Sequence, residues 1–310
     1  MKLTGLIAAT YTPFREDGTV NLDLIPGMID YMIESGVSGF YVCGSTGEGE
    51  SMSVEERKQV AQASVSATKG RLPVVVQVGH NSVESACELA RHAAEIGADA
   101  ISTLPPTYFK PANVDLLVDF IARVSACAPD LPYYYYHIPR MSGVSPDLVE
   151  FMQKACDRVP RFHGIKFSDF FLADLTTCLE FEDGRLDVLF GSDEMILGAL
   201  ATGAKGAVGS TYGFAAPLFA QIIKTYGEGK MKDAQSWMTK AVRLIRLIDK
   251  EPGPYHSCVK QVVWPLLGFE VGPCRVPQAV LSEEEVAHAR ARLEESGFAQ
   301  ELAREEFQLS

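Results

Sequence analysis

Short runs of apolar and β-branched residues alternate with longer amphipathic segments along most of the chain. Eight short runs, each ending near Gly, Ser, Thr or Pro, predict strands at Leu6–Ala9, Gly39–Cys43, Val74–Val78, Ala98–Thr103, Pro132–His137, Gly164–Phe167, Val188–Gly191 and Ala207–Gly209. Apolar positions spaced three and four residues apart predict helices at Leu24–Ser35, Val54–Thr68, Val83–Ile96, Val114–Ala128, Pro146–Ala155, Leu172–Phe181, Asp193–Thr202 and Ala216–Tyr226. Regular alternation of this kind is typical of βαβ units and a parallel sheet.

This pattern predicts an α/β protein with a closed (β/α)8 barrel, a TIM barrel, over residues 1–230. An open doubly wound sheet is the alternative, but it requires a glycine-rich phosphate turn after the first strand. Here Leu6–Ala9 runs into Thr-Tyr-Thr-Pro-Phe without G-x-G-x-x-G, so the barrel is favoured. Residues 231–310 predict a small C-terminal helical extension for subunit contact or bracing, with helices at Met231–Lys250, Ser257–Leu267 and Glu283–Ser296.

Composition and charge exclude several function classes. With 47% hydrophobic and 22% charged residues among 310, the chain is expected to be globular. The 28 Lys and Arg residues against 40 Asp and Glu leave a net charge of −12, which disfavours nucleic-acid binding. No apolar run is long enough to span a membrane. Seven dispersed cysteines suit free thiols and a cytoplasmic location, and the scattered histidines predict no metal site and no cofactor.

Polar and reactive residues follow five of the predicted strands. Because the carboxyl ends of all barrel strands meet at one mouth, we expect the active site there. The five segments are Gly44–Glu48, Tyr136–Pro139, Lys166–Asp169, Gly191–Glu194 and Gly209–Tyr212.

Lys166 is the principal candidate nucleophile. Gly164 and Lys166 share one face of their strand, whereas Ile165 and Phe167 share the other and must face the helices. Lys166 therefore points into the barrel, with Gly164 leaving space beneath it. Lost hydration lowers the pKa of a buried lysine and frees its amine to attack a carbonyl carbon. The alternative, an ordinary ion pair with Asp169 or another carboxylate, is more frequent for a lone lysine.

A proton relay and an anion site are predicted beside this lysine. Alternation along Tyr133–Tyr136 places Tyr134 and Tyr136 on one face, and Tyr136, at the strand end, could move a proton with help from the Thr46 hydroxyl. The other rings are expected to fill the barrel layers. Ser45 and Thr46 lie in a glycine-flanked turn whose N–H groups could hold a carboxylate or phosphate, or the turn simply requires glycine.

Asp193 and Glu194 open the helix that follows the seventh predicted strand. Helix capping is one explanation for adjacent acids at such a position. At a barrel mouth, the same two carboxylates would suit a polyhydroxylated ligand. Both interpretations remain open on the sequence alone.

Five motifs carry a family resemblance: GSTGE (44–48), YHIP (136–139), GIKFSD (164–169), GSDE (191–194) and GSTY (209–212). They resemble the N-acetylneuraminate lyase subgroup of the class I, Schiff-base-forming lyases, a wider group that includes dihydrodipicolinate synthase. The likeness runs from the opening LIAATYTPF to the helical tail.

The resemblance implies reversible cleavage of N-acetylneuraminate to pyruvate and N-acetylmannosamine. Lys166 would form the imine, Ser45 and Thr46 would hold the pyruvate carboxylate, and Tyr136 would move the proton. Tyr108, in PPTYFKP, matches a tyrosine that in relatives reaches the neighbouring subunit's site, and relatives are commonly tetramers, so a homotetramer is expected. Positions matching contacts to the sugar hydroxyls are Ser168, Gly191, Asp193, Glu194 and Ser210.

One position separates the lyase from the synthase interpretation. Synthases place an Arg five residues after the strand-five tyrosine, and this chain has Met141. An apolar side chain cannot neutralise a second carboxylate, and the acids at 193–194 would repel one, so the lyase is favoured. Arg140 is one residue away, and a shift into the site would point to a different acidic sugar. His137 stands where bacterial relatives more often carry Asn, which bears on substrate range.

Two other functions stay open. Lys166 and Tyr136 would serve equally well in another pyruvate-dependent aldolase or dehydratase that acts on a 2-keto-3-deoxy sugar acid. A non-catalytic relative that binds a sugar acid is disfavoured, because the nucleophile, the proton relay and the carboxylate turn are all present together. In each case the expected partner is a small molecule.

Overall fold

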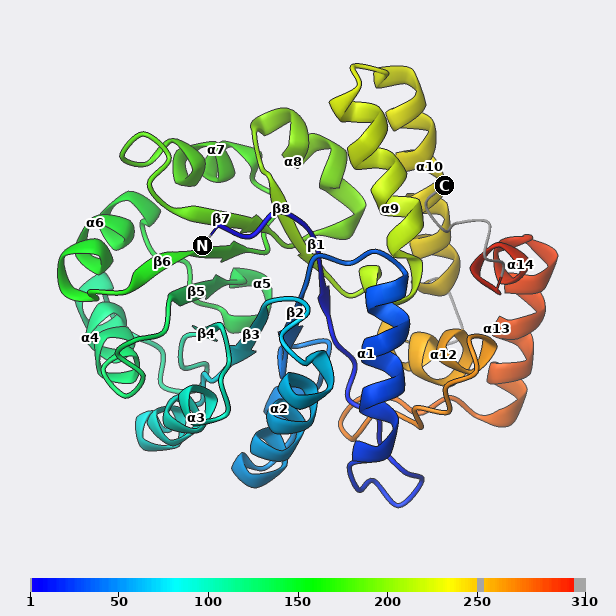
Figure 1. Ribbon diagram of the computed structural model, residues 1–310, viewed down its shortest axis with the longest axis horizontal. Coiled ribbons are helices and arrows are strands. Elements are labelled where there is room, and N and C mark those ends of the chain that lie inside the picture. Colours follow the sequence, from blue (N-terminus) through cyan, green and yellow to red (C-terminus); the bar gives the residue numbers. More distant parts are fainter. Residues whose placement is uncertain (1, 250–253, 304–310) are drawn as a thin grey trace.

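The computed structural model describes residues 2–249 and 254–303, and its centre is a closed parallel barrel surrounded by helices (Figure 1). Strands pair in chain order and β8 closes the barrel on β1, so the predicted (β/α)8 barrel is confirmed. The strands are β1 (Gly5–Ala9), β2 (Gly39–Val42), β3 (Val74–Gln77), β4 (Ala100–Thr103), β5 (Tyr133–His137), β6 (Phe162–Phe167), β7 (Asp187–Phe190) and β8 (Gly206–Gly209).

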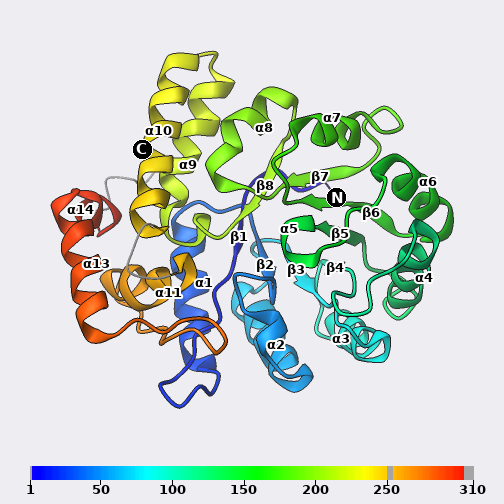
Figure 2. The same ribbon diagram turned by 180° about the vertical axis from the view of Figure 1, so that it is seen from behind.

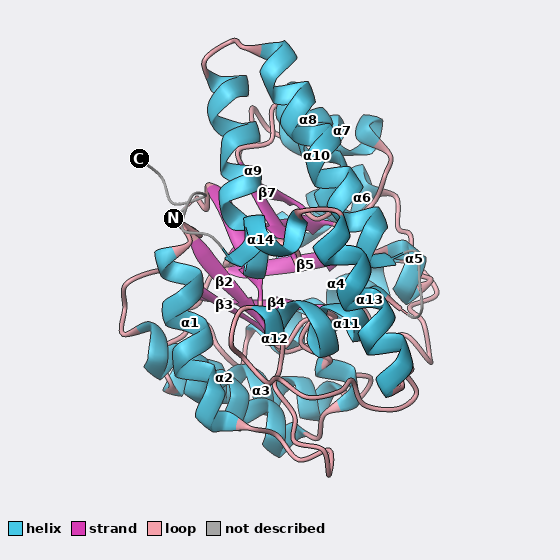
Figure 3. Cartoon of the chain, turned by 90° about the vertical axis from the view of Figure 1, so that its right-hand side faces the viewer, coloured by secondary structure: helices cyan, strands magenta, loops and turns pink. Residues whose placement is uncertain are grey.

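Helices connect successive strands and cover the outside of the barrel (Figure 3). They are α1 (Ile25–Glu34), α2 (Val54–Thr68), α3 (Val83–Glu95), α4 (Val114–Ser125), α5 (Pro139–Ser142), α6 (Leu148–Arg158), α7 (Leu172–Glu180), α8 (Ile196–Thr202) and α9 (Tyr212–Gly227). Short 3-10 turns are η1 (Leu22–Leu24), η2 (Gly49–Ser51) and η3 (Asp193–Met195). Every helix predicted between strands is present, and α5 is a short helix that the periodicity did not predict.

Local capping and proline geometry decide where several helices begin. Ser53 and Glu56 form a capping box that starts α2. The helix predicted from Pro146 is α6, and it begins at Leu148 instead. Asp147 caps it, because its side chain accepts a hydrogen bond from the Glu150 N–H at 2.9 Å. Helix α9 starts earlier than predicted: a first turn precedes a kink at Ala215 (φ −132°), after which Pro217 lies in the resumed helix.

Strand alternation divides the core into two layers. Inward side chains from β1, β2, β3, β4, β5, β7 and β8 pack inside the barrel, whereas outward ones pack against the helices. In β5, Tyr134 and Tyr136 belong to the inner layer and Tyr133 and Tyr135 to the outer one. The predicted alternation of the tyrosine run is confirmed, and it fixes which rings reach the barrel interior.

The C-terminal extension packs against α9 and α1 on one side of the barrel (Figure 2). It contains α10 (Met231–Asp249), α11 (Tyr255–Cys258), a π-helical turn η4 (Val259–Val263), α12 (Trp264–Leu266), α13 (Glu283–Glu295) and α14 (Phe298–Ala303). The predicted helix Ser257–Leu267 is thus three shorter pieces. The last residue of the predicted Met231–Lys250 helix lies outside the described residues, as do 251–253 and 304–310.

Aromatic packing anchors this extension to the barrel wall. The Trp264 ring is fully buried and lies 6.2 Å from the ring of Tyr11, after β1, and 5.9 Å from that of Tyr31, on α1. The predicted bracing contact is therefore present. A division of the chain at residue 230 stays a prediction; that residue falls in the turn between α9 and α10. Within 2–249 and 254–303, no helix combines the length and apolarity needed to cross a membrane.

Candidate active site

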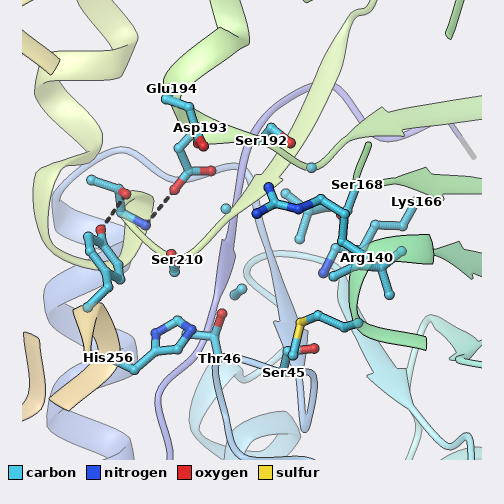
Figure 4. Close-up of a pocket in the computed structure, with 18 of the residues that line it drawn as sticks. Ser45, Thr46, Arg140, Lys166, Ser168, Ser192, Asp193, Glu194, Ser210 and His256 are labelled. Atoms are coloured by element: carbon cyan, nitrogen blue, oxygen red, sulfur yellow. Dashed lines mark hydrogen bonds between the residues drawn. The ribbon is translucent and has the colours of Figure 1, made fainter. Parts of the chain in front are cut away.

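A cavity of about 490 Å³ opens at the carboxyl ends of the barrel strands (Figure 4). It brings together nine of the predicted site residues: Ser45, Thr46, Tyr136, Lys166, Ser168, Gly191, Asp193, Glu194 and Ser210. Strand closure causes this convergence, because segments up to 165 residues apart in sequence end at the same mouth. Tyr108 is the predicted site residue that does not line the cavity.

Lys166 points into the barrel from β6, as its position in the strand predicts. Its side chain is only 4% exposed. Its Nζ lies 3.9 Å from the centre of the Tyr41 ring and 3.8 Å from that of Tyr136. Burial lowers the pKa of Lys166, and a hydrogen bond with Tyr136 partly opposes this effect. The site therefore favours a neutral amine more than water does.

An ion pair between Lys166 and Asp169 is not observed in the described residues. Asp169 accepts a hydrogen bond from the Phe170 N–H at 2.6 Å, and its Oδ2 lies 3.8 Å from His137 Nε2. The alternative structural explanation of Lys166 by pairing with this carboxylate thus has no support in the geometry.

The floor beneath Lys166 is filled. A Cβ at Gly164 would overlap the Asp187 carbonyl oxygen and lie 3.0 Å from the Tyr134 ring. The Tyr134 hydroxyl donates a hydrogen bond to Asp187 Oδ2 at 2.6 Å, which fixes this layer. The expectation that Gly164 leaves free space was wrong: glycine is required there because β6 and β7 approach too closely for a side chain.

Tyr136 and the turn after β2 lie beside the amine. The Tyr136 hydroxyl is 3.5 Å from Ser45 Oγ, and its ring packs edge to face on Tyr41 at 5.6 Å. Thr46, the next residue in the turn, is buried. One phenol and two hydroxyl-bearing residues thus surround the space next to the nucleophile, which is the arrangement that proton transfer and carboxylate binding both need.

The conformation of that turn is demanding. The Glu48 N–H donates to the Ser45 carbonyl at 3.1 Å, while Cys43 and Glu48 both adopt left-handed φ angles of 60° and 54°. A Cβ at Gly47 would lie 2.9 Å from the Thr10 carbonyl oxygen, so glycine is required there. Such strained backbone persists only where the surrounding structure holds it in place.

A fully buried ion pair supplies that support. Lys260, on the π-helical turn of the extension, lies with its Nζ 2.8 Å from Glu48 Oε1, and both side chains have no exposed surface. The Arg275 N–H donates to the other oxygen, Glu48 Oε2, at 2.8 Å. Lys260 also lies 4.1 Å above the Phe14 ring. The extension therefore fixes the end of the turn that carries Ser45 and Thr46.

Asp193 and Glu194 have different environments. Asp193 is buried, and its Oδ2 accepts the Thr211 N–H at 2.8 Å, so it braces the loop after β8 rather than capping its own helix. Burial raises the pKa of Asp193 to about 6. Glu194 is exposed at the rim, where its carboxylate is available to a ligand.

The extension also contributes to the cavity wall, which the sequence analysis did not predict. Tyr255 and His256 line it, as do Ile245 and Asp249. The Tyr255 hydroxyl lies 2.7 Å from Thr211 Oγ1. Helical periodicity says which face of a helix is buried but not which part of the barrel it will cover, so no signal in the chain placed these residues at the site.

Tyr108 lies on the loop between β4 and α4 and is 79% exposed. Its ring packs edge to face against Phe109 at 4.9 Å, and its N–H donates to Asn81 Oδ1 at 3.1 Å. Neither of these two residues lines the cavity of its own chain. A role for Tyr108 in a neighbouring subunit stays a prediction.

His137 and Arg140 follow Tyr136 but face opposite ways. The His137 ring stacks on Phe167 at 5.3 Å on the helix side of the barrel, and burial lowers the pKa of His137 to about 4. Direct contact between His137 and a ligand in the cavity is therefore not part of this geometry. Arg140 and Met141 both line the cavity, so Arg140 is inside the site without any loop shift.

No set of three or more His, Cys, Asp or Glu side chains is positioned to hold a metal ion in the described part of the chain.

Comparison with known proteins identifies the family of the chain. Residues 2–296 match the model of the dihydrodipicolinate synthetase family. N-acetylneuraminate lyase of Rattus norvegicus is 40% identical over 300 residues, covering 96% of this chain and 93% of that protein, and that of Danio rerio is 43% identical over 282 residues, covering 89% and 91%.

Solved structures are similar over the same length. Proteus mirabilis N-acetylneuraminate lyase has a TM-score of 0.91 at 40% identity, covering 96% of this chain and 100% of that one. The Aliivibrio salmonicida N-acetylneuraminate lyase (sialic acid aldolase) has a TM-score of 0.92 at 40% identity, covering 96% and 98%. With a family model that spans nearly its whole length, this chain belongs to the dihydrodipicolinate synthetase family.

Proposed function

We propose that the protein is a class I aldolase that reversibly cleaves N-acetylneuraminate into pyruvate and N-acetylmannosamine. The observation that carries the proposal is the buried Lys166 amine, held between the Tyr41 and Tyr136 rings at the base of a cavity lined with hydroxyls and carboxylates. The similarity to proteins named N-acetylneuraminate lyase supports this choice of substrate.

In the proposed reaction, the neutral Lys166 amine attacks the keto carbon of the open-chain sugar acid and loses water to form a protonated imine. The C–C bond between the carbons α and β to the imine carbon then breaks. Its electron pair moves toward the imine and gives an enamine. The hydroxyl on the leaving carbon loses its proton and becomes the aldehyde of N-acetylmannosamine. Protonation of the enamine and hydrolysis of the imine release pyruvate and restore Lys166.

Tyr136 is the proposed proton carrier, because its hydroxyl lies beside the nucleophile and 3.5 Å from Ser45 Oγ. The Thr46 hydroxyl is expected to assist it. Ser45 and Thr46 would hold the carboxylate through the N–H groups and hydroxyls of their turn. The hydroxyl chain of the sugar would lie against the more distant wall, formed by Ser168, Gly191, Asp193, Glu194 and Ser210.

A second candidate is an aldolase or dehydratase for a 2-keto-3-deoxy sugar acid. The position of Arg140 inside the cavity is the observation that favours it, because a cation there could meet another acidic sugar. Product identity separates the two: a dehydratase keeps all carbons in one molecule, whereas the lyase releases pyruvate.

Assembly and location complete the proposal. We expect a homotetramer in which the exposed Tyr108 reaches a neighbouring subunit, and light scattering coupled to size-exclusion chromatography measures its mass. A cytoplasmic location is supported by the seven cysteines, none of which is paired in a disulfide among the described residues.

Borohydride trapping tests the chemistry. The protein is incubated with N-acetylneuraminate, reduced, and analysed by intact mass and peptide mapping, with Lys166→Ala as the matched control. A reduced pyruvyl adduct on Lys166 demonstrates both the imine and C–C cleavage. If borohydride traps an adduct with added pyruvate but none with N-acetylneuraminate, the imine chemistry stands but the sugar is wrong. If neither compound traps, the protein binds a sugar acid without catalysis.

A further inference from the structure

Arg140 places a positive charge without a carboxylate partner on the exposed wall of the cavity. It lies on α5, four residues after Tyr136, and its guanidinium carbon is 4.6 Å above the Phe170 ring. Figure 4 shows the side chain reaching from this wall toward the side that carries Asp193 and Ser210. Among the described residues, no carboxylate lies within ion-pair distance of the guanidinium. The residue is exposed, and none of its guanidinium N–H groups donates to another described residue.

The position of Arg140 relative to the nucleophile assigns it to the sugar half of the cavity. Lys166 and Tyr136 lie at the base, on β6 and β5, whereas α5 begins only after β5 has ended. Phe170, on which the guanidinium rests, is 38% exposed and belongs to the loop after β6. Arg140 thus sits at the outer part of the wall, beyond the strand residues Lys166 and Tyr136.

The two walls of this outer part differ in chemistry. A guanidinium has five N–H donors in a planar fork and no acceptor, whereas the Glu194 carboxylate only accepts. Stacking on Phe170 restrains the direction of the fork. A ligand between the walls must offer acceptor oxygens toward Arg140 and hydroxyl donors toward Glu194.

We propose that Arg140 is a specificity-determining residue that donates hydrogen bonds to acceptor oxygens of the leaving sugar and disfavours sugars bearing a free ammonium group. This inference rests on the proposed aldolase function and deepens it. It selects N-acyl and hydroxylated aldehyde sugars, whose carbonyl and hydroxyl oxygens are neutral acceptors, over amino sugars, whose ammonium group would meet a like charge.

The test uses the condensation direction, in which pyruvate and the aldehyde sugar are varied separately. Arg140→Met keeps side-chain length but removes the donors and the charge. It should raise the KM for N-acetylmannosamine roughly tenfold or more, because hydrogen bonds from charged groups are among the strongest. The KM for pyruvate and the yield of borohydride-trapped pyruvate on Lys166 should stay unchanged. Arg140→Lys should recover part of the loss, since it restores the charge without the fork.

A second substrate separates charge from shape. Mannosamine, assayed below the pKa of its amine, should have a lower kcat/KM than N-acetylmannosamine for the wild type. Arg140→Met should reduce the ratio of the two kcat/KM values. Met141→Ala is the control, because Met141 lines the same cavity without a charge. It should leave the preference between the two sugars as it is.

The outcomes are distinguishable. If Arg140→Met leaves the KM for N-acetylmannosamine unchanged, or shifts the KM for both substrates equally, the inference is wrong while the aldolase function stands. If wild-type protein forms no imine with pyruvate, or forms it but does not condense it with N-acetylmannosamine, the proposed function and the inference both fall.

Discussion

Removing the charge of Lys260 should destabilise the protein far more than the loss of an ordinary ion pair. In Lys260→Met, a side chain of similar length replaces the ammonium group, and the fully buried Glu48 carboxylate keeps the Arg275 N–H and the Cys274 thiol as partners but no positive charge within ion-pair distance among the described residues. Breaking a pair of this kind typically costs about 3–5 kcal/mol, because an uncompensated charge remains buried. An exposed pair costs about 0–1 kcal/mol.

The assay is urea unfolding of wild type, Lys260→Met, Glu48→Gln and the double variant, followed by circular dichroism. Burial lowers the pKa of Lys260, which shows that desolvation outweighs its attraction to Glu48. The double variant should therefore be more stable than Lys260→Met, because it leaves no buried charge without a partner. A loss below about 1 kcal/mol in Lys260→Met would refute the reasoning, since the pair would then behave as a surface pair.

The same variant should affect the site. Glu48 ends the turn that carries Ser45 and Thr46, so a change in its position displaces the groups proposed to hold the carboxylate. Lys260→Met should raise the KM for pyruvate more than the KM for the sugar, measured in the condensation direction. Lys58→Met, on an exposed pair with Glu88, is the control that should change neither stability nor KM appreciably.

Four further outcomes are expected. Tyr136→Phe should lower kcat by about 10²–10⁴-fold while imine formation persists, and an unchanged kcat would exclude Tyr136 as the proton carrier. Tyr108→Phe should slow turnover sharply and leave imine formation intact; unchanged turnover would remove it from the site. Because the pKa of Asp193 is raised in the folded protein from 3.8 to about 6, wild type should lose unfolding free energy relative to Asp193→Asn as pH rises through that interval, and parallel profiles would contradict this sign. Tyr255→Phe removes the contact with Thr211 and should raise the KM for the sugar about twofold to tenfold without affecting pyruvate trapping; an equal rise for pyruvate would indicate a general distortion.

Strand periodicity predicted the barrel and the direction of its inward side chains. The period of two in β5 and β6 separated Tyr136 and Lys166 from their outward neighbours, and the structure places both inside. This succeeded because a strand with one face against helices and one toward the barrel interior leaves little freedom of register. The expectation of free space at Gly164 was wrong, because the backbone of β7 pairs closely with β6 and fills that space.

Contacts between distant segments could not be predicted. Glu48 and Lys260 are separated by 212 residues, and nothing in the spacing of either indicates its partner. Asp193 supports the loop that begins at Thr211, a role that local helix capping does not suggest. In both cases a tertiary contact with a segment distant in sequence explains the buried charge, and hydrophobic periodicity does not predict such contacts.

The base and the outer wall of the cavity come from different elements, and this difference separates imine chemistry from sugar recognition. The base comes from barrel strands, whose inward side chains are fixed by pairing on both sides, so Lys166 and Tyr136 have little freedom to move. The outer wall comes from α5, the loops after β6, β7 and β8, and the extension, whose side chains reach the cavity from outside the strand ladder, as Tyr255 does beside Thr211. A substitution there changes one donor or acceptor and leaves the strands in place. Imine chemistry should therefore tolerate changes in the outer wall, while the choice of sugar depends on residues such as Arg140.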